Sequence, residues 1–392
     1  MSPVPMSPEP RTPHPGGSSS HGPTWALIAG GGTAGHVVPG LAVANELVSR
    51  GHRPSTIHFV GAGRGIEAEL VPAAGFDITL LPGRGVQRTL TWDNVGAVTG
   101  LLRAAVQAVA LVRRRRPSVV LALGGFASAA VAVAAVLWRV PLVVADQNAR
   151  AGAANRLVAR FAAACAVPFP ETDLPRAVVT GNPVREEILE VAADHDRDGA
   201  RRELGLPLDR TVVVAFAGSL GARRLNDALY GAVQQWQDRT DLAVHHVIGA
   251  RDWESRPDLE PGGLDYRAVR YESRMQLALA AADLVVCRSG GTTVAELAAI
   301  GVPSILVPLP IATRDHQTAN AGPLVRSGAA VLVPDAELDT DRLVTEIEAL
   351  LGGGPERLSS MAAAARALGR PDAAAAVADL VEDSARPPAS GR

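Results

Sequence analysis

The sequence predicts an α/β protein made of two doubly wound parallel-sheet domains in tandem. Short apolar runs of strand length alternate with longer segments of helical length, and this pattern starts again after residue 185. Several of the apolar runs end in glycines that lead directly into a helical segment. With 392 residues, 47% of them apolar, the chain is long enough for two domains that each bury a core.

The first half contains four runs that we predict to be strands. They cover residues 25–29, 56–60, 119–123 and 142–145. Each is followed by glycine or polar turn residues and then by an amphipathic or alanine-rich stretch, which is typical of βαβ units. We place this domain at residues 24–184 and expect the Pro-, Ser- and Gly-rich residues 1–23 to be a disordered tail.

The second half repeats the pattern. Its predicted strands cover residues 211–217, 243–248, 284–287, 304–307 and 329–333. The charged residues 187–202 come first and are interpreted as a solvated linker, so that the halves meet near residues 182–187. We place the second domain at residues 185–383, leave open whether its last helix packs back on the first domain, and expect residues 384–392 to be disordered.

Residues 118–138 have two features of a membrane-spanning helix: they contain no charged residue, and they follow the basic residues 113–116. Gly124 and Gly125 divide the stretch into a β-branched part of strand length and an alanine-rich part of helical length. A buried strand, turn and helix is therefore favoured over a true span.

Composition excludes several classes of protein. The formal net charge is -2, which argues against a nucleic-acid partner. All basic residues are arginines, so a Walker A phosphate loop and a Schiff-base mechanism, which need lysine, are excluded. Cys165 and Cys287 lie far apart in apolar sequence, which disfavours a disulfide or zinc site and fits a reducing compartment.

The first predicted strand ends in a glycine loop. Gly30, Gly32 and Gly35 satisfy G-x-G-x-x-G, and a helix beginning there would point its N–H groups at a phosphate. A dinucleotide site also needs an acidic residue at the end of the second strand, and Glu67 comes too late for that role. A nicotinamide-dependent oxidoreductase is disfavoured for this reason.

Three other groups of residues point to a sugar nucleotide. His36 follows the first glycine loop and suits proton removal from a hydroxyl near neutral pH. Ser289, the glycines after it and the threonines at 292 and 293 can donate to a diphosphate, while Glu296 can accept from a ribose diol. Residues 314–320 carry many hydrogen-bonding groups suited to sugar hydroxyls.

The motifs together resemble those of the MurG family, bacterial N-acetylglucosaminyltransferases of peptidoglycan synthesis. The resemblance covers roughly residues 24 to 375 and rests on Gly31-Gly32-Thr33-Ala34-Gly35-His36-Val37-Val38-Pro39-Gly40-Leu41-Ala42, Gly124-Gly125-Phe126-Ala127-Ser128, Asp146-Gln147-Asn148, Gly181-Asn182-Pro183-Val184-Arg185, Gly218-Ser219-Leu220-Gly221-Ala222-Arg223 and Cys287-Arg288-Ser289-Gly290. Three positions depart from the family pattern: Ala34 stands for a glycine, Asp146 for a glutamate and His316 for a glutamine.

The resemblance implies a GT-B fold, with two Rossmann-like domains and a cleft between them. It implies an inverting transfer of N-acetylglucosamine from UDP-N-acetylglucosamine (UDP-GlcNAc) to the C4 hydroxyl of the muramyl sugar in lipid I, which yields lipid II. It also implies a candidate base, His36, and a set of donor-site residues: Thr33, Ala34, Gly35, Asn148, Arg185, Ser219, Glu296, Gln317 and Asn320. Loops containing Gly32, Gly35, Gly124 and Gly125 would face the acceptor diphosphate, and the uracil would lie near residues 271–275.

No metal or tightly bound cofactor is expected. The triplet Asp194-His195-Asp196, which could suggest a metal site, lies in the predicted linker. Arg185 and helix N-termini could stabilise the departing diphosphate without a metal. Alternatives stay open: another GT-B transferase with a different sugar nucleotide or lipid acceptor, or a catalytically silent scaffold that binds a sugar nucleotide.

The lipid acceptor requires contact with a membrane. A basic and apolar segment is formed by Arg84, Arg88, Leu90, Trp92 and the region 86–102, and the arginines at 113–116 and the pair Trp138-Arg139 add to it. An amphipathic helix that faces the core explains the pattern equally well. We expect peripheral attachment to the cytoplasmic leaflet of the cell membrane, with cell-wall synthesis or division proteins as further partners.

Overall fold

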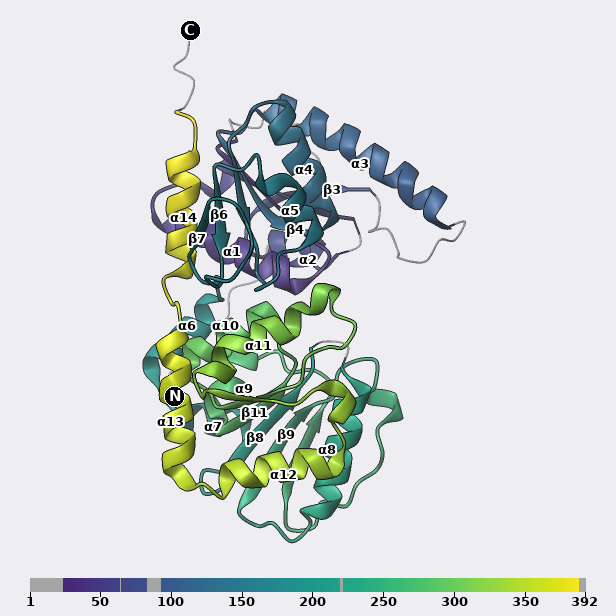
Figure 1. The fold of residues 1–392 in the computed structure, drawn as a ribbon, viewed down its shortest axis with the longest axis vertical. Coiled ribbons are helices and arrows are strands. Elements are labelled where there is room, and N and C mark those ends of the chain that lie inside the picture. The colour runs from purple at the N-terminus through teal and green to yellow at the C-terminus, as the bar shows by residue number, and fades with distance from the viewer. Residues whose placement is uncertain (1–23, 64, 83–92, 219–220, 388–392) are drawn as a thin grey trace, which may run out of the picture.

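A computed structural model describes residues 24–63, 65–82, 93–218 and 221–387, with residues 93–99 and 101 described by backbone only. Two domains are stacked along the long axis of the molecule (Figure 1). Each contains one parallel sheet covered by helices, as the sequence predicts. The expected tails, Ser219 and residues 84–92 of the proposed membrane segment fall partly or wholly outside the described residues.

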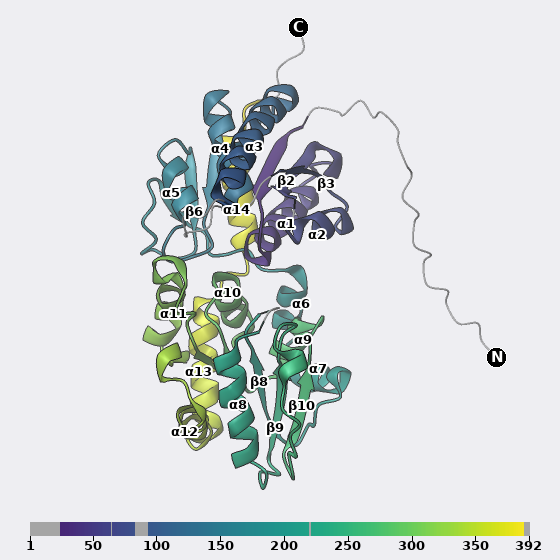
Figure 2. The same cartoon turned by 90° about the vertical axis from the view of Figure 1, so that its right-hand side faces the viewer.

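The first domain has a seven-stranded sheet in the order β3-β2-β1-β4-β5-β6-β7. Its elements are β1 (Ala26–Gly30), α1 (Ala34–Ser49), β2 (Ile57–Ala62), α2 (Glu67–Ala73), β3 (Asp77–Leu81), α3 (Asp93–Arg115), β4 (Val119–Gly124), α4 (Gly125–Leu137), β5 (Leu142–Ala145), α5 (Ala153–Ala159), β6 (Ala164–Val167) and β7 (Ala177–Val179). Helices α3, α4 and α5 cover one face of the sheet, and α1 covers the other (Figure 2).

The second domain has a six-stranded sheet in the order β10-β9-β8-β11-β12-β13. Its elements are α6 (Glu186–Asp194), α7 (Arg197–Leu204), β8 (Thr211–Phe216), α8 (Arg223–Gln235), β9 (Leu242–Val247), β10 (Asp265–Val269), α9 (Met275–Ala281), β11 (Leu284–Cys287), α10 (Gly291–Ile300), β12 (Ser304–Leu306), α11 (His316–Arg326), β13 (Ala330–Leu332), α12 (Thr340–Leu351), α13 (Gly354–Leu368) and α14 (Ala373–Ser384).

Both sheets reverse their strand order beside the first strand of the domain, at β1/β4 and at β8/β11. Open α/β sheets bind ligands at such switch points, outside the carboxyl ends of the strands. The strand–glycine–helix junctions found in the sequence lie at these two points.

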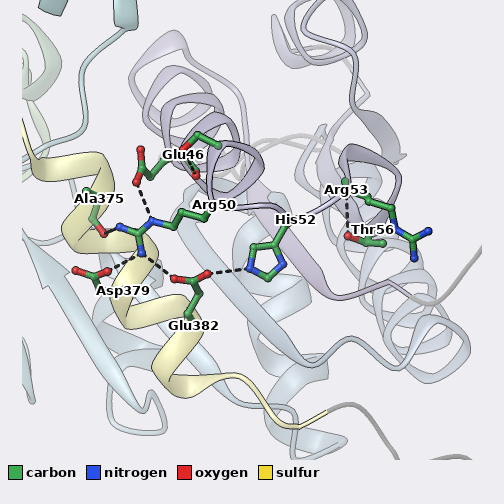
Figure 3. Close-up of polar contacts among 9 residues, drawn as sticks. Glu46, Arg50, His52, Arg53, Thr56, Ala375, Asp379 and Glu382 are labelled. Atoms are coloured by element: carbon green, nitrogen blue, oxygen red, sulfur yellow. Dashed lines mark hydrogen bonds and ion pairs between the residues drawn. The ribbon is translucent and has the colours of Figure 1, made fainter.

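The last helix leaves its own domain. Helix α14 packs on α1 and against β4, β5 and β6 of the first domain, and Val377, Ala378 and Val381 are buried there. Figure 3 shows the polar contacts at this junction, in which Arg50 donates to Asp379 at 2.6 Å and to Glu382 at 2.7 Å. The C-terminal helix α14 therefore ties the second domain to the first.

The structure tests the two interpretations of residues 118–138, a buried strand and helix or a membrane span. Residues 119–137 form a buried strand followed by a helix, as predicted, although α4 begins at Gly125 with no separate turn. No helix within the described part of the chain is both long and apolar enough to cross a membrane.

The prediction of a solvated linker at residues 187–202 is wrong. This segment forms α6 and α7, which pack on the second domain and bury Ile188 and Arg201. Arg201 donates to the Ala281 carbonyl at 3.0 Å and to Asp283 at 2.6 Å. Arg201, one of the charges that suggested a linker, is therefore a packing partner, whereas most of the other charged residues of this segment are exposed on the surface of the two helices.

Strands β3, β6, β7 and β10 were missing from the sequence prediction. Strands β3 and β10 lie at sheet edges, are partly exposed and mix polar with apolar residues. Strand β7, also at an edge, has only three residues, and all of them are exposed. Strand β6 is short and alanine-rich, a composition that also suits a helix.

Candidate functional site

Two glycine junctions meet at the switch point of the first sheet. Gly30 at the end of β1 is paired with Gly124 at the end of β4. Gly124 and Gly125 both have positive φ, 108° and 84°, which favours glycine. A Cβ on Gly125 would collide with the Gly31 carbonyl, so two loops far apart in the sequence are in backbone contact.

The first loop ends where α1 begins. Thr33 has extended backbone at the N-cap and Ala34 is the first helical residue, so alanine is accommodated where the family pattern has glycine. Gly32 and Thr33 are exposed, and Gly35 and His36 are half-buried. The predicted loop residues therefore stand together at the edge of the sheet.

His36 is held through its Nδ1 atom. This nitrogen lies 3.2 Å from the Gly31 carbonyl oxygen and 3.3 Å from Thr33 Oγ1. Since a carbonyl only accepts, the contact with Gly31 requires a proton on Nδ1, which leaves Nε2 as the basic nitrogen. Burial lowers the pKa of His36, and the Gly31 contact and the charges of Asp146 and Glu67 oppose that effect.

Glu67 lies under the same loop, although sequence reasoning set it aside. Its carboxylate accepts from Gly32 N–H at 3.0 Å and from Ala62 N–H at 2.8 Å, and its side chain is buried. Gly32 belongs to the loop expected to face the acceptor diphosphate, and its N–H thus donates to a carboxylate of the chain itself.

The second domain presents the N-terminus of α10 to the first. Gly291 begins this helix, and a Cβ there would collide with the carbonyl of Gln147. Thr292 Oγ1 lies 3.8 Å from the position of a Cβ on Gly35, so the N-termini of α1 and α10 come together. The hydroxyls of Ser289 and Thr292 are buried and make no hydrogen bond among the described residues.

Asn148 and Asn320, both predicted to contact the transferred sugar, join the domains. Asn320 Nδ2 donates to Asn148 Oδ1 at 3.1 Å, and Asn320 Oδ1 accepts from Ala149 N–H at 2.8 Å. Asp146 holds this turn by accepting from Asn148 N–H at 3.0 Å and from Gly152 N–H at 2.9 Å. Aspartate thus fills a structural role at the position where the family pattern has glutamate.

Arg185 and Glu296 pair with each other. Arg185 Nε and Nη2 both lie 3.2 Å from Glu296 Oε1. Burial raises the pKa of Glu296, and the neighbouring guanidinium of Arg185 opposes that effect. The predicted diphosphate and ribose residues therefore stand side by side between α6 and α10.

The loop before α11 also reaches the first domain. Arg150 donates to the Arg314 carbonyl at 2.6 Å, and Arg314 donates back to the Ala151 carbonyl at 3.1 Å. Gln317 Oε1 accepts from Leu309 N–H at 2.9 Å, which orients its amide at the start of α11. His316 Nδ1 contacts the Thr313 carbonyl at 2.9 Å, so this departure from the family pattern caps the loop.

Other expected residues lie elsewhere or are not described. Ser219 is outside the described residues. In the stretch 271–275, expected near the uracil, Glu272 lies 3.4 Å from the buried His245. Among the described residues no group of three or more His, Cys, Asp or Glu could hold a metal ion.

A cavity of about 410 Å³ also lies between the domains. Phe169, Asn182, Val294, Leu324 and Leu368 are among the residues that line it. The residues predicted to bind the donor are not in its lining.

The sequence matches family models for both halves of this arrangement. The Glycosyltransferase family 28 N-terminal domain matches residues 26–167, and the Glycosyltransferase family 28 C-terminal domain matches residues 212–377. These two matches include every strand of the two sheets apart from β7 and the first residue of β8, and they include the glycine junctions described above.

Curated relatives match along almost the whole chain. The UDP-N-acetylglucosamine–N-acetylmuramyl-(pentapeptide) pyrophosphoryl-undecaprenol N-acetylglucosamine transferase of Alkalilimnicola ehrlichii is 43% identical over 363 residues, which are 92% of this chain and 99% of that relative. The protein of the same name from Desulforudis audaxviator is 40% identical over 368 residues, which are 91% of this chain and 97% of that relative.

A solved structure agrees. The crystal structure of Acinetobacter baumannii MurG is 28% identical, has a TM-score of 0.72 and covers 92% of this chain and all of that one. The chain therefore belongs to glycosyltransferase family 28 and, within it, to the MurG family of N-acetylglucosamine transferases.

Proposed function

We propose that the chain transfers N-acetylglucosamine from UDP-GlcNAc to the C4 hydroxyl of the muramyl sugar in lipid I, with inversion at the anomeric carbon, to give lipid II. One observation supports this most directly: the N-termini of α1 and α10, from different domains, face each other beside His36. Two positive helix ends in one interface suit a diphosphate, and a neutral imidazole beside them suits a hydroxyl.

In the proposed step His36 Nε2 removes the proton from the C4 hydroxyl. The hydroxyl oxygen forms a bond to the anomeric carbon of the donor, and the bond from that carbon to the diphosphate oxygen breaks. The electron pair of the broken bond leaves with UDP. Attack opposite the leaving group inverts the anomeric centre.

The departing diphosphate needs compensation for its charge. Arg185 is positioned to supply a guanidinium, and its side chain is partly exposed beside Glu296. The helix N-termini supply backbone N–H groups and the positive end of the dipole. The hydroxyls of Ser289 and Thr292, which have no hydrogen-bond partner in the described part of the chain, are further potential donors.

The remaining donor contacts are proposed from the family resemblance. Glu296 is proposed to accept from the ribose diol, with Arg185 holding its carboxylate in place. The amides of Asn148, Gln317 and Asn320 are proposed to bind the hydroxyls of the transferred sugar. We propose that no metal or tightly bound cofactor takes part.

The described residues of the first domain carry an apolar patch, defined here as Leu102 and Val106 on α3, Val133 and Leu137 on α4, and Trp138 directly after α4. These side chains are between 41% and 69% exposed, and α3 and α4 lie side by side (Figures 1 and 2). Exposed arginines at 103, 113, 114, 116 and 139 accompany the patch, with Arg113 5.6 Å from the Trp138 ring centre.

This combination is suited to a membrane that carries anionic lipids. Apolar side chains enter the interface while arginines contact headgroups. Between residues 94 and 170 Asp146 is the sole acidic residue, so little charge opposes the contact. We propose peripheral attachment to the cytoplasmic leaflet through the apolar patch, where the lipid acceptor resides.

Incubation with labelled UDP-GlcNAc and a short-chain lipid I analogue, with and without a chelator, tests the function. We expect labelled disaccharide product in both reactions. Transfer to diacylglycerol and not to the lipid I analogue would favour the alternative of another GT-B transferase. Loss of transfer on chelation that added Mg²⁺ restores would contradict the proposed independence from metal.

A further inference from the structure

The carboxylate of Glu67 occupies a chamber built from glycines. A Cβ on Gly31, Gly61 or Gly65 would collide with the Glu67 side chain, so three glycines leave room for one carboxylate. Glu67 is the first residue of α2 and is 1% exposed. Burial of a carboxylate costs free energy unless hydrogen bonds compensate for it. A site lined by glycines for one carboxylate therefore indicates that the hydrogen bonds of Glu67 have a role.

Those contacts lead to His36 through a single peptide group. The N–H of Gly32 and the carbonyl of Gly31 belong to the same peptide. The N–H donates to Glu67 Oε1 at 3.0 Å, and the carbonyl oxygen lies 3.2 Å from His36 Nδ1. Hydrogen bonds in such a chain polarise one another, so a carboxylate on the N–H makes the carbonyl a stronger acceptor.

We propose that Glu67 is a positioning residue for His36: through the Gly31–Gly32 peptide it holds the imidazole with its proton on Nδ1 and keeps Nε2 available as the base. The inference rests on the proposed role of His36 in the transfer. In this arrangement Glu67 and one peptide group orient the imidazole, as a directly bonded aspartate does in a catalytic triad.

Two charged groups of the described residues act on His36. Glu67 approaches from α2 and Asp146 from the turn after β5, and both favour the imidazolium. The Thr33 hydroxyl, which contacts His36 Nδ1 beside the Gly31 carbonyl, is uncharged. Removal of the Glu67 charge should therefore lower the pKa of His36 further and weaken it as a base, because one of two favourable charges is lost.

A structural role predicts something different. If Glu67 only holds the loop and the start of α2, its replacement lowers thermal stability and leaves the imidazole unchanged. Glu67→Gln separates the two readings, because glutamine retains a carbonyl that can accept from Gly32 and Ala62 but lacks the charge. Glu69→Gln removes an exposed carboxylate from the same helix and is the matched control.

The direct test is ¹⁵N NMR of histidine-labelled protein, with His36→Gln used to assign the signal. In the wild type we expect the Nδ1–H tautomer at high pH. In Glu67→Gln we expect a mixture of tautomers and a midpoint at lower pH, and in Glu69→Gln no change. A wild-type His36 that carries its proton on Nε2 overturns the proposal even if Glu67→Gln does not fold.

Kinetics give the second readout. In Glu67→Gln we expect kcat to fall by about tenfold, the acid limb of the kcat/KM profile to move to lower pH, and the donor KM to stay the same. If the wild type transfers sugar and Glu67→Gln is folded, an acid limb at the same pH in both proteins would refute the role of Glu67. Absence of transfer by the wild type would instead refute the proposed function, while the NMR result would stand separately.

Discussion

Asn320 on α11 and Asn148 after β5 are hydrogen-bonded across the domain interface, with 3.1 Å between Asn320 Nδ2 and Asn148 Oδ1. Asn320 is fully buried and also accepts from Ala149 N–H and donates to the Ser289 carbonyl. One side chain thus fixes the second domain against the turn that carries a predicted sugar contact.

Asn320→Ala should loosen this interface. The change leaves the Ala149 N–H without its acceptor, which costs about 1–3 kcal/mol if the group stays buried. We expect lower thermal stability, a larger radius of gyration in small-angle scattering and about tenfold weaker donor binding by calorimetry. Asn148→Ala removes one of these bonds and should have a smaller effect on stability. Equal radii and affinities for Asn320→Ala and wild type would contradict the interface role.

His36→Ala should abolish most turnover with little effect on donor binding. A positioned base contributes about a hundredfold or more to the rate, whereas the donor contacts reside mainly in the second domain. The measurement is kcat from product formation alongside donor affinity by calorimetry. A proportionate loss of both would remove the base assignment.

The pH profile of the wild type follows from the same residue. A protonated imidazole cannot accept the hydroxyl proton, so activity declines as the pH falls through the pKa of His36. Burial lowers that pKa from its usual value of 6.5, so the acid limb of kcat/KM, which reports the free enzyme, should lie below pH 6.5 and should be absent in the residual activity of His36→Ala. An acid limb retained by that variant would assign the limb to another group.

Glu296→Ala should weaken donor binding more than turnover. The change removes the proposed ribose acceptor and leaves the Arg185 guanidinium without its partner. We expect a donor KM about tenfold higher, as for loss of hydrogen bonds to a charged group. A donor analogue that lacks both ribose hydroxyls should bind wild type and variant equally. An unchanged donor KM would count against the ribose role.

Leu137→Glu should reduce membrane attachment. Leu137 is 62% exposed in the apolar patch, and burial of a leucine is worth about 1.5–3 kcal/mol, so binding to phosphatidylglycerol vesicles should weaken by about tenfold. Leu208→Glu alters an exposed leucine of the second domain and should not change vesicle binding. Salt should weaken wild-type binding. Attachment that survives high salt and carbonate would argue against peripheral contact.

Glu382→Gln should destabilise the attachment of α14 at neutral pH. Burial alone would raise the pKa of Glu382, but hydrogen bonds from Arg50 and His52 (Figure 3) outweigh it and hold the pKa below its usual range. A depressed folded-state pKa gives stability above the unfolded value that is lost as pH falls through the folded value. The difference in melting temperature between wild type and variant should therefore shrink with acidification.

Asp383→Asn is the control for that experiment, because Asp383 is an exposed neighbour on the same helix. It should leave melting temperatures close to wild type across the pH range. A difference for Glu382→Gln that stays constant with pH would show that the carboxylate charge is not what holds α14.

The sequence by itself determined the two sheets and the position of their ligand-binding edges. Apolar runs followed by glycines place most of the central strands, because these strands are buried on both faces and read as continuous apolar segments. The residues at their carboxyl ends, such as His36 and Glu296, follow directly. The edge strands β3, β7 and β10, the short strand β6 and the helices α6 and α7 escaped prediction, because short, exposed or charged segments are also compatible with loops.

Only the tertiary structure decided which of these residues meet. Asn148 and Asn320, or Arg185 and Glu296, are more than a hundred residues apart, and no local pattern encodes their pairing. Glu67 shows the same limit more sharply, since distance along the chain excluded it from a ribose site while folding placed it beneath the first glycine loop. Local periodicity records which face of an element is buried, whereas the partner of a buried polar group is set by how separate elements pack.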